Sequence, residues 1–409
     1  MIVRTRFFFQ GLAYSGFLLV LLFSVKTFEE AIPDKMYVEL GEEVTYDFGV
    51  PVTVVLKEDA EEVFGGNGNP YRMRDKSYTV TCMLFGCLPV KDVEVTLIDG
   101  TAVYAGGTTV GIYAKMNGVL VIGTGNVALS DGEEKSPAEN LVKGGDYIVS
   151  VNGEMVDEKE ALSELINTYG QEKEVLGIIR NDEYIEVAAT PVKAENEQYM
   201  LGIWVRDDLA GIGTLTYYTE EGKYGALGHP VSDGDTGTRV EVKQGDIYEA
   251  DIVGIRRGED GNPGEISGVI NYGDSYKVGT IEKNCEKGIY GTLNGNQKDY
   301  LKDAYFEVAY KQDIVLGKAY ILSDVSGEIE QYEIEIQSLD FSGREENKGI
   351  LIHVTDEKLL RLTGGIVQGM SGSPVIQNGR IIGAVTHVLV NDPTKGYGIF
   401  IENMLEHDN

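Results

Sequence analysis

The chain has 409 residues, enough for two or three domains, and its hydrophobic content of 42% is that of a globular protein. It contains 52 glycines but 10 prolines, a balance that favours a turn-rich β protein over a disordered chain. The formal net charge of −31 argues against nucleic acid or anionic lipid head groups as partners, because both are bound through Lys and Arg.

The cysteine and histidine content gives no reason to expect a metal or any other cofactor. Three cysteines are too few for a disulfide framework, although Cys82 and Cys87 are close enough in sequence to pair and would leave Cys285 free. The chain has four histidines and no C-x-x-C or H-E-x-x-H spacing, so the ligand sets of common zinc sites are missing.

The N-terminus resembles a membrane anchor. Arg4 and Arg6 precede an apolar run from Phe7 to Val25, and about nineteen residues is just enough to span a bilayer. Because residues 26–31 contain no A-x-A cleavage site, we expect residues 1–26 to form a cytoplasmic stub and a signal anchor rather than a cleaved signal peptide. The positive-inside rule then places everything after the anchor outside the cytoplasm.

Two regions follow the anchor. Residues 27–95 alternate apolar and polar side chains, as at 36–40 and 51–56, which predicts a β-rich linker region. Residues 96–195 show a more specific order: strands near 109–112 and 118–123, a helix, turn, strand and turn over 136–153, a helix over 157–169, and strands near 175–180 and 184–189.

The sequence Gly145-Asp146-x-Ile148-x-x-Val151-Asn152-Gly153, preceded by Pro137-Ala138, resembles the core motif of a PDZ domain. A PDZ domain binds an extended peptide by adding it as a strand to the edge of its sheet. The resemblance implies a PDZ domain over 96–195, with a peptide-binding loop at Thr109, Val110, Gly111 and Ile112.

Residues 196–409 are punctuated by glycine and contain short apolar runs without a long amphipathic helix, a pattern typical of a β-barrel or β-sandwich. The segment Gly369-Met370-Ser371-Gly372-Ser373-Pro374 stands out, because it is followed by two apolar runs joined by Asn378-Gly379. Asn-Gly between apolar runs predicts a β-hairpin, so Ser371 is expected in a glycine-rich turn that leads into a hairpin.

The turn at Ser371 differs from the G-x-S-x-G elbow of α/β-hydrolases, because Ser373 stands in place of the last glycine and Pro374 leads into a strand. It is similar to the G-x-S-G-G-P turn of chymotrypsin-like double-barrel proteases. In that reading Ser371 is the nucleophile, and the N–H groups of Gly369 and Ser371 form the oxyanion hole. An ordinary Gly/Ser turn is the alternative.

A serine nucleophile needs a base, and histidine titrates in the right range. His229 lies in a glycine-proline turn that could expose its ring in a cleft, so we rank it first and His387 second; His353 and His407 are weaker candidates. A carboxylate usually orients such a histidine. Asp356 precedes Ser371 by fifteen residues in Thr355-Asp356-x-x-Leu359-Leu360, where a helix N-cap is its simplest role.

The order of anchor, PDZ unit, Gly228-His229-Pro230 turn, Thr355-Asp356 motif and Ser371 turn resembles the stage IV sporulation protein B peptidases of endospore-forming bacteria. The resemblance covers nearly the whole chain and is densest over 196–404. It implies a catalytic triad of His229, Asp356 and Ser371. The expected fold is therefore mainly β, with an N-terminal transmembrane anchor, a PDZ domain and a chymotrypsin-like double β-barrel peptidase domain over 196–409.

The same resemblance implies a self-cleaving serine endopeptidase of the forespore membrane. Its catalytic domain would act in the intermembrane space on a membrane-bound processing complex and so trigger sigma factor activation. Its partners would be protein substrates, including itself, a peptide ligand of the PDZ domain, and the membrane. Two alternatives remain: an envelope scaffold with an inactive peptidase-like domain, and a general quality-control protease, which is disfavoured because its PDZ domain would usually follow the protease domain.

Overall fold

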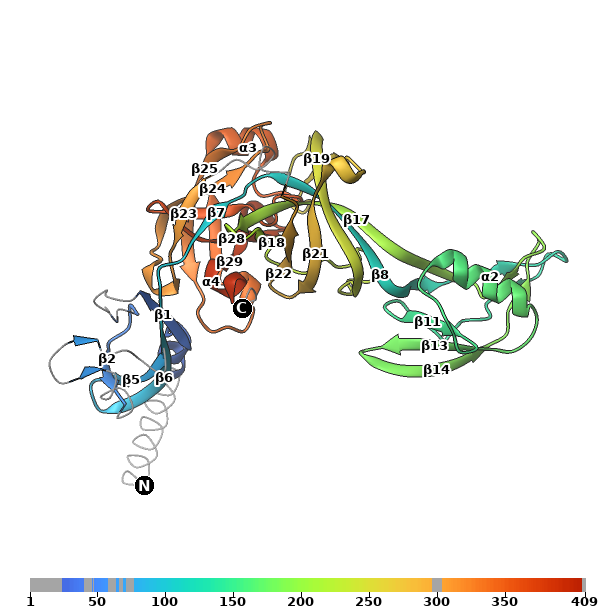
Figure 1. Ribbon diagram of the computed structural model, residues 1–409, viewed down its shortest axis with the longest axis horizontal. Coiled ribbons are helices and arrows are strands. Elements are labelled where there is room, and N and C mark those ends of the chain that lie inside the picture. Colours follow the sequence, from blue (N-terminus) through green and yellow to red (C-terminus); the bar gives the residue numbers. More distant parts are fainter. Residues whose placement is uncertain are drawn as a thin grey trace, which may run out of the picture.

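The computed structural model of the protein describes residues 24–39, 46, 48–57, 64–65, 69–70, 77–295 and 304–406. Three parts follow one another along the longest axis of the molecule: an N-terminal sheet, a central pair of barrels, and a smaller module that carries helix α2 (Figure 1). No helix of the described residues is long and apolar enough to cross a membrane. The expected anchor, 7–25, lies almost entirely in residues 1–23, outside the described residues.

The N-terminal part is a four-stranded sheet with the order β1-β6-β5-β2. Its strands are β1 (Lys35–Glu39), β2 (Val52–Leu56), β5 (Ser77–Leu84) and β6 (Leu88–Ile98), and a separate pair is formed by β3 (Phe64–Gly65) and β4 (Asn69–Pro70). Alternate residues of β5 are buried, so one face of the sheet forms a small core around Met36, Val80 and Val93. Cys82 is buried in this core, Cys87 is exposed, and neither forms a disulfide.

The first barrel is a closed ring of strands paired in the order β8-β17-β18-β22-β21-β19 and back to β8, all antiparallel. Their bounds are β8 (Thr109–Thr124), β17 (Ile203–Tyr218), β18 (Lys223–Ala226), β19 (Val242–Arg256), β21 (Lys277–Cys285) and β22 (Gly288–Leu293). The barrel encloses a core that includes Val110, Leu215 and Tyr224. Strand β20 (Glu265–Ile270) pairs with the far end of β19 and extends beyond the ring.

The second barrel closes in the same way, in the order β24-β25-β26-β29-β28-β27 and back to β24. Its elements are β24 (Gly317–Ser323), β25 (Glu330–Leu339), β26 (Ile350–Val354), α3 (Glu357–Thr363), β27 (Pro374–Gln377), β28 (Arg380–Leu389), β29 (Asp392–Phe400) and α4 (Ile401–Leu405). Strands β7 (Ala102–Ala105) and β23 (Tyr305–Val308) join the barrels, because β7 pairs with β17 and β23 pairs with β28. The expected double barrel is therefore present.

The predicted hairpin after Ser371 is also confirmed. Gln377 pairs with Arg380 across the turn between β27 and β28. Asn378 and Gly379 both have positive φ, at 51° and 79°, which is the backbone of the tight turn that Asn-Gly favours.

The third part is the module that was compared with a PDZ domain. It contains the following elements: β9 (Val127–Ala128), β10 (Glu134–Lys135), β11 (Tyr147–Val151), β12 (Glu154–Met155), α2 (Lys159–Tyr169), β13 (Glu174–Arg180), β14 (Glu183–Ala189), β15 (Val192–Lys193) and β16 (Tyr199–Met200). The motif residue Asp146 is fully buried and accepts two hydrogen bonds from Arg180, at 2.8 and 2.6 Å. The aspartate thus ties the turn before β11 to the end of β13.

Two strands belong to both the first barrel and the module. In β8, residues 109–116 pair with barrel strands β17 and β19, whereas Val119 and Leu120 pair with β11 of the module. Strand β17 returns beside β8 along its whole length, so the two form a continuous ribbon between the parts (Figure 1). The segment 96–195, expected to be a PDZ domain, therefore contributes β7 and half of β8 to the barrels.

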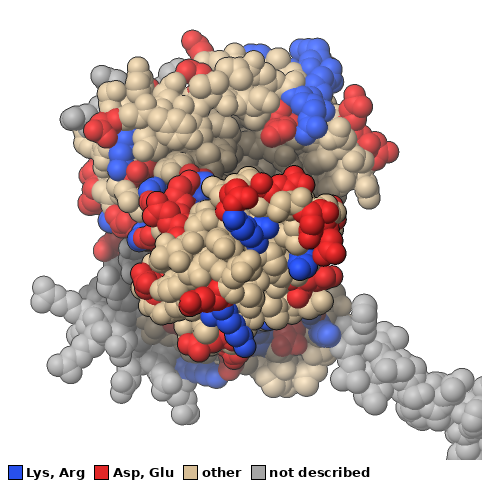
Figure 2. All heavy atoms as spheres, turned by 90° about the vertical axis from the view of Figure 1, so that its right-hand side faces the viewer, with Lys and Arg blue, Asp and Glu red and all other residues tan. Residues whose placement is uncertain are grey.

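The face of the module that Figure 2 shows carries charges of both signs. Figure 2 shows this end of the molecule, where Lys and Arg side chains lie singly among more numerous Asp and Glu side chains. This distribution agrees with the net charge of −31.

One buried acid in the module has no partner. Glu174, the first residue of β13, is fully buried, and neither carboxylate oxygen has a hydrogen-bond partner. Burial raises the pKa of Glu174 from 4.5 to about 7. The folded protein therefore holds this proton more tightly than the unfolded chain. The contribution of protonated Glu174 to the stability of the fold is complete below about pH 4.5 and is lost as the pH rises through about 7.

We predict that Glu174→Gln removes this pH dependence, because the neutral amide cannot ionise. At pH 8 the variant should be more stable than the wild type by at most about 3 kcal/mol, the equivalent of the shift in pKa. Urea unfolding at pH 5 and pH 8, followed by the fluorescence of Trp204, reports on this module because the chain has a single tryptophan. The exposed position Glu186 supplies the control Glu186→Gln, and an unchanged pH dependence in Glu174→Gln would contradict the prediction.

Candidate active site

Ser371 and His229 face one cavity between the two barrels. The cavity has a volume of about 440 Å³ and is lined from the first barrel by Leu227 and His229, and from the second by Gly369, Ser371 and His387, among others. Two predicted residues that are 142 positions apart in the sequence are therefore brought to one site, because the turn between β18 and β19 lies against the turn before β27.

Ser371 lies in the loop between α3 and β27. Helix α3 ends at Gly364 in the left-handed conformation (φ 79°), and the loop then runs through Gly369 (φ 101°) to the strand at Pro374. The Ser371 hydroxyl is partly exposed to the cavity and donates a hydrogen bond of 2.9 Å to the carbonyl oxygen of Thr386. Rotation about a single side-chain bond can release it toward the cavity.

The backbone around Ser371 leaves two N–H groups unengaged. The N–H groups of Gly369 and Ser371 donate to no acceptor in the described part of the chain. The other four N–H groups of this turn are all bonded: Gln368 to Gly264 O at 3.2 Å, Met370 to Val367 O at 3.1 Å, Gly372 to Val385 O at 2.7 Å and Ser373 to Met370 O at 3.0 Å. The two open donors are the two that the sequence predicted for an oxyanion hole.

Hydrogen bonds on the carbonyl side fix the direction of these donors. In a planar trans peptide unit the N–H and the C=O point in opposite directions. The carbonyl of Gln368 accepts from the N–H of Ile266 at 2.8 Å, and the carbonyl of Met370 accepts from the N–H of Ser373 at 3.0 Å. Because both carbonyls are held, the two open N–H groups are oriented before any substrate arrives.

Thr214 of β17 holds the same turn from the first barrel. Its hydroxyl donates to the carbonyl of Gly369, and its N–H donates to the carbonyl of Ser371, both at 2.9 Å. Neither Thr214 nor Ile266 was identified from the sequence, and only the pairing of distant strands reveals them.

The geometry of His229 selects one tautomer. Its Nδ1 lies 2.8 Å from the carbonyl oxygen of Pro230. A carbonyl can only accept, so Nδ1 carries the proton and Nε2 keeps a free lone pair. Burial lowers the pKa of His229 below its usual 6.5, against the opposing effect of the Pro230 carbonyl. The ring is therefore neutral at pH 7 and able to accept a proton at Nε2.

The second-ranked histidine, His387 of β28, is the neighbour of His229 in the cavity. The two ring centroids are 5.1 Å apart with the planes tilted by 41°. Burial, followed by the proximity of His229, lowers the pKa of His387 to about 4, and its Nδ1 is buried without a partner. Both imidazoles are thus uncharged near neutral pH.

The structure does not bring Asp356 to the histidine. Asp356 is the N-cap of α3: its Oδ1 accepts from the N–H groups of Lys358 and Leu359 at 2.8 and 2.9 Å, and its Oδ2 accepts from Glu333 N at 3.3 Å. It does not line the cavity of Ser371. In this structure Asp356 therefore caps α3 and makes no hydrogen bond to His229, whose Nδ1 is bonded to the carbonyl of Pro230. The place of Asp356 in a catalytic triad stays a prediction.

The predicted peptide-binding loop at Thr109, Val110, Gly111 and Ile112 is wrong. These residues are buried at the start of β8, where Val110, Gly111 and Ile112 are paired on both edges, with β17 and with β19, and Thr109 pairs with β17. No edge remains for a peptide. The spacing in the sequence led to the wrong position for the loop because strand β8 continues from the barrel into the module. The first half of β8 pairs with barrel strands, and only its second half pairs with the module.

A groove in the module lies beside α2 instead. It has a volume of about 570 Å³ and is lined by Leu162 and Ile166 of α2 and by residues 199–205, which run from β16 into the start of β17. Residues 203–206 of β17 pair with β8 on one edge, and in the described chain no strand pairs with the other edge. An open strand edge beside an apolar helix face is the arrangement that accepts an added peptide strand.

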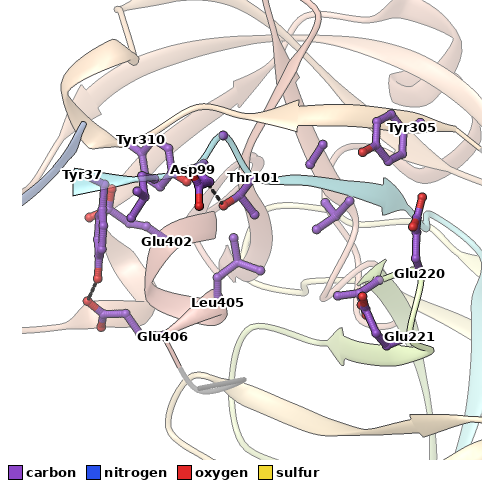
Figure 3. A pocket seen from close by; sticks show the side chains of 15 residues that line it. Tyr37, Asp99, Thr101, Glu220, Glu221, Tyr305, Tyr310, Glu402, Leu405 and Glu406 are labelled. Atoms are coloured by element: carbon purple, nitrogen blue, oxygen red, sulfur yellow. Dashed lines mark hydrogen bonds between the residues drawn. The ribbon is translucent and has the colours of Figure 1, made fainter. Parts of the chain in front are cut away.

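Another cavity, of about 550 Å³, lies where the N-terminal sheet meets the barrels. Its acidic and tyrosine side chains surround the opening, and Tyr37 donates to Glu406 at 2.7 Å (Figure 3). Buried Glu402 is paired with Lys311 at 2.8 Å. Neither a histidine nor a serine is among the described residues that line this cavity. No group of three or more His, Cys, Asp or Glu suited to a metal occurs in the described ranges.

Comparison with known proteins shows which family the chain belongs to. The family model described as SpoIVB peptidase S55 matches residues 197–405, which include Ser371, His229 and both barrels except β7 and β8. The chain belongs to the SpoIVB peptidase S55 family. Membership supports a serine peptidase. No curated protein matches this S55 peptidase.

Several solved structures are similar to parts of this S55 peptidase. The PDZ domain of the SdrC-like protein from Listeria monocytogenes is 16% identical, with 22% of this chain and 90% of that chain covered, at a TM-score of 0.18. The Rv3671c protease of M. tuberculosis H37Rv in its inactive form is 12% identical, with 48% and 83% covered, at a TM-score of 0.25. A serine-to-alanine mutant of Rv3671c, also in the inactive form, is 12% identical, with 48% and 80% covered, at a TM-score of 0.24.

We predict that Gly369→Ala slows the reaction of Ser371 with a fluorophosphonate by about 10²–10³-fold, the usual value of one oxyanion donor. Gly369 has φ 101°, which L residues rarely adopt, and an added Cβ would lie 3.0 Å from Cβ of Ile266. The peptide unit must then turn and move its N–H.

Gly379→Ala is the matched control, because Gly379 also has positive φ (79°) but has open space around it and does not line the cavity. Labelling rates are measured by gel fluorescence on variants with unchanged circular dichroism. Equal rates for the two variants would contradict the role of Gly369.

Proposed function

We propose that this chain is a serine endopeptidase in which Ser371 is the nucleophile and His229 is the general base. The observation that carries the proposal is the cavity between the barrels. There a hydroxyl, an imidazole with a free Nε2, and two open N–H donors meet around one volume. Each of the three components is needed for acyl transfer by a serine.

The reaction begins when the Ser371 hydroxyl turns from the carbonyl of Thr386 toward Nε2 of His229. His229 takes the proton as the oxygen attacks the substrate carbonyl, and the negative charge moves to the carbonyl oxygen, which the N–H groups of Gly369 and Ser371 bind. His229 then gives its proton to the leaving amine. Water, deprotonated by the same Nε2, hydrolyses the acyl-enzyme and restores the serine.

The carbonyl of Pro230 performs part of the task that a carboxylate performs in a triad. It holds the proton on Nδ1, which keeps the correct tautomer and orients the ring. It carries no full charge, so it stabilises the imidazolium less than an aspartate would. We propose a Ser371–His229 pair of this kind, with Asp356 acting as the cap of α3.

We predict that Ser371→Ala abolishes proteolysis of a denatured protein such as casein and reaction with a fluorophosphonate, without loss of folding. The control is Ser373→Ala, two residues later in the same turn. The Ser373 hydroxyl is fully buried, has no hydrogen-bond partner and does not line the cavity, so this variant should stay active. Casein cleavage by Ser371→Ala at the wild-type rate would end the proposal.

Substitution of Asp356 distinguishes the role of a helix cap from the role of a triad aspartate. Asn caps helices as well as Asp does, so Asp356→Asn should retain kcat within a few-fold. Asp356→Ala should lose about 1 kcal/mol of stability through the lost cap. The measurements are kcat on a peptide substrate and the melting temperature. A loss of about 10⁴ in kcat for Asp356→Asn with normal melting is the result expected of a triad aspartate and would contradict the helix-cap assignment.

The family resemblance extends the proposal to a biological setting. We propose that the chain is tethered to the forespore membrane by residues 7–25, with its catalytic part in the intermembrane space, and that it cleaves itself. It would then cleave a membrane-bound processing complex and so start sigma factor activation. Expression of the full chain and of Ser371→Ala tests self-cleavage: shortened forms lacking the N-terminus should occur only with the wild type, and identical processing of both would oppose it.

A peptide segment is the proposed ligand of the groove beside α2. The open edge of β17 at 203–206 supplies the backbone partners, and Leu162 and Ile166 supply an apolar wall. The alternative function, a peptide-binding envelope scaffold with an inactive peptidase-like domain, keeps this groove but predicts no labelling of Ser371 by a fluorophosphonate.

A further inference from the structure

We infer that the cavity at Ser371 selects an apolar side chain on the residue whose carbonyl is attacked, an inference that rests on the proposed peptidase function. The oxyanion donors place that carbonyl beside Ser371. The side chain of that residue is attached to the Cα next to the attacked carbonyl carbon. The cavity walls nearest to Ser371 therefore determine which side chains can be accommodated.

The walls next to the reacting serine are apolar on both sides. Ile366 and Val367 come directly before the oxyanion segment, and both are almost completely buried, at 2% and 1% exposure. Val388 lies two residues beyond Thr386, whose carbonyl holds the Ser371 hydroxyl. All three line the cavity. The side chain of a substrate residue bound beside Ser371 therefore contacts apolar side chains.

The first barrel completes the cavity with the same chemistry. Ile212 of β17 and Leu227, which directly follows β18, line the wall on the side of the first barrel. Pro263, from the segment before β20, also lines the cavity. The polar side chains that reach it are the catalytic groups, His387, and a few neutral side chains such as Gln368.

No charged residue is available to pair with a charged substrate side chain. Among the described residues that line the cavity, none is Asp, Glu, Lys or Arg. The two charged side chains whose fields act on His387, Lys348 and Glu345, form an ion pair with each other at 2.7 Å. Burial of an unpaired charge is strongly unfavourable, whereas burial of an aliphatic or aromatic side chain is favourable.

This preference is opposite to what the net charge would suggest. At −31 the protein attracts basic segments over long range, and a basic residue next to the cleaved bond would follow if that attraction reached the site. The apolar walls of the cavity disfavour a basic residue at that position. Long-range attraction affects how fast a substrate reaches the protein, whereas the cavity determines which side chain is buried. A substrate can thus be basic in its flanking parts and apolar at the cleaved residue.

The test uses three tripeptide aldehydes that differ only in the last residue, which carries the aldehyde: Leu, Lys or Glu. Each competes with a fluorophosphonate for Ser371 of the full chain, so no natural substrate is required. We expect the Leu aldehyde to protect at about a 100-fold lower concentration than either charged one, comparable to the discrimination that hydrophobic pockets reach.

A matched pair of variants tests the wall itself. Val388→Asp introduces a carboxylate into the cavity and should reduce the preference for Leu over Lys at least about 10-fold. Val253→Asp introduces the same charge on β19, where the side chain is 64% exposed and does not line the cavity, and should change nothing. Cleavage-site profiling of casein by mass spectrometry, with Ser371→Ala as background, should give the same order of residues.

The outcomes separate this inference from the proposed function. Protection that is strongest with the Lys or Glu aldehyde, or equal for all three, overturns the apolar selection while Ser371 remains a reactive nucleophile. A wild-type chain whose Ser371 takes no label overturns the proposed peptidase function, and the inference falls with it.

Discussion

The catalytic geometry depends on how the turn from Gln368 to Ser373 is held. Its backbone bonds to three strands that are distant in sequence: β17 through Thr214, β20 through Ile266, and β28 through Val385. Together with the bond from Gln368 to Gly264 and two bonds within the loop, they leave only the N–H groups of Gly369 and Ser371 without an acceptor among the described residues of this turn. Because an unpaired backbone donor is costly when it is buried, the two exceptions lie where an oxyanion can satisfy them.

The backbone of one short turn determines the position and tautomer of His229. His229 sits in a turn whose preceding residues, Leu227 and Gly228, both have positive φ, at 69° and 72°. This unusual backbone brings the ring next to the carbonyl of its own neighbour, Pro230, and fixes the tautomer locally. The proposed base is therefore positioned within one short segment of the first barrel and the proposed nucleophile by the second barrel, and the packing of the two barrels brings both to one cavity.

Features encoded by adjacent residues could be predicted from the sequence. The Asn378–Gly379 hairpin, the helix expected at 157–169 and observed at Lys159–Tyr169, and the strand after Asp146 all depend on local conformation. Ser371 and His229 were proposed for the same reason, since each lies in a glycine-containing turn, and the structure places both at one cavity. Asp356 was ambiguous because a helix cap and a catalytic acid use the same residue type.

Features that depend on distant pairing could not be predicted. The strands expected separately at 109–112 and 118–123 form one strand, β8, because β17 and β19 are available to pair with it. A PDZ-like pattern after residue 118 made the preceding residues look like part of the same unit. Only the register with β17 shows that Thr109–Ile112 complete a barrel.

The placement of β8 has a practical consequence for dissecting this protein. A fragment that starts at residue 197, where the family match begins, would contain Ser371 and His229 but would lack β8, leaving β17 and β19 each with an unpaired edge and the barrel open. Open edges of this kind promote aggregation. Removal of the module is better achieved by excising it from within, joining β8 to β17 by a short hairpin near Met116 and Asp208, where the chain already runs antiparallel.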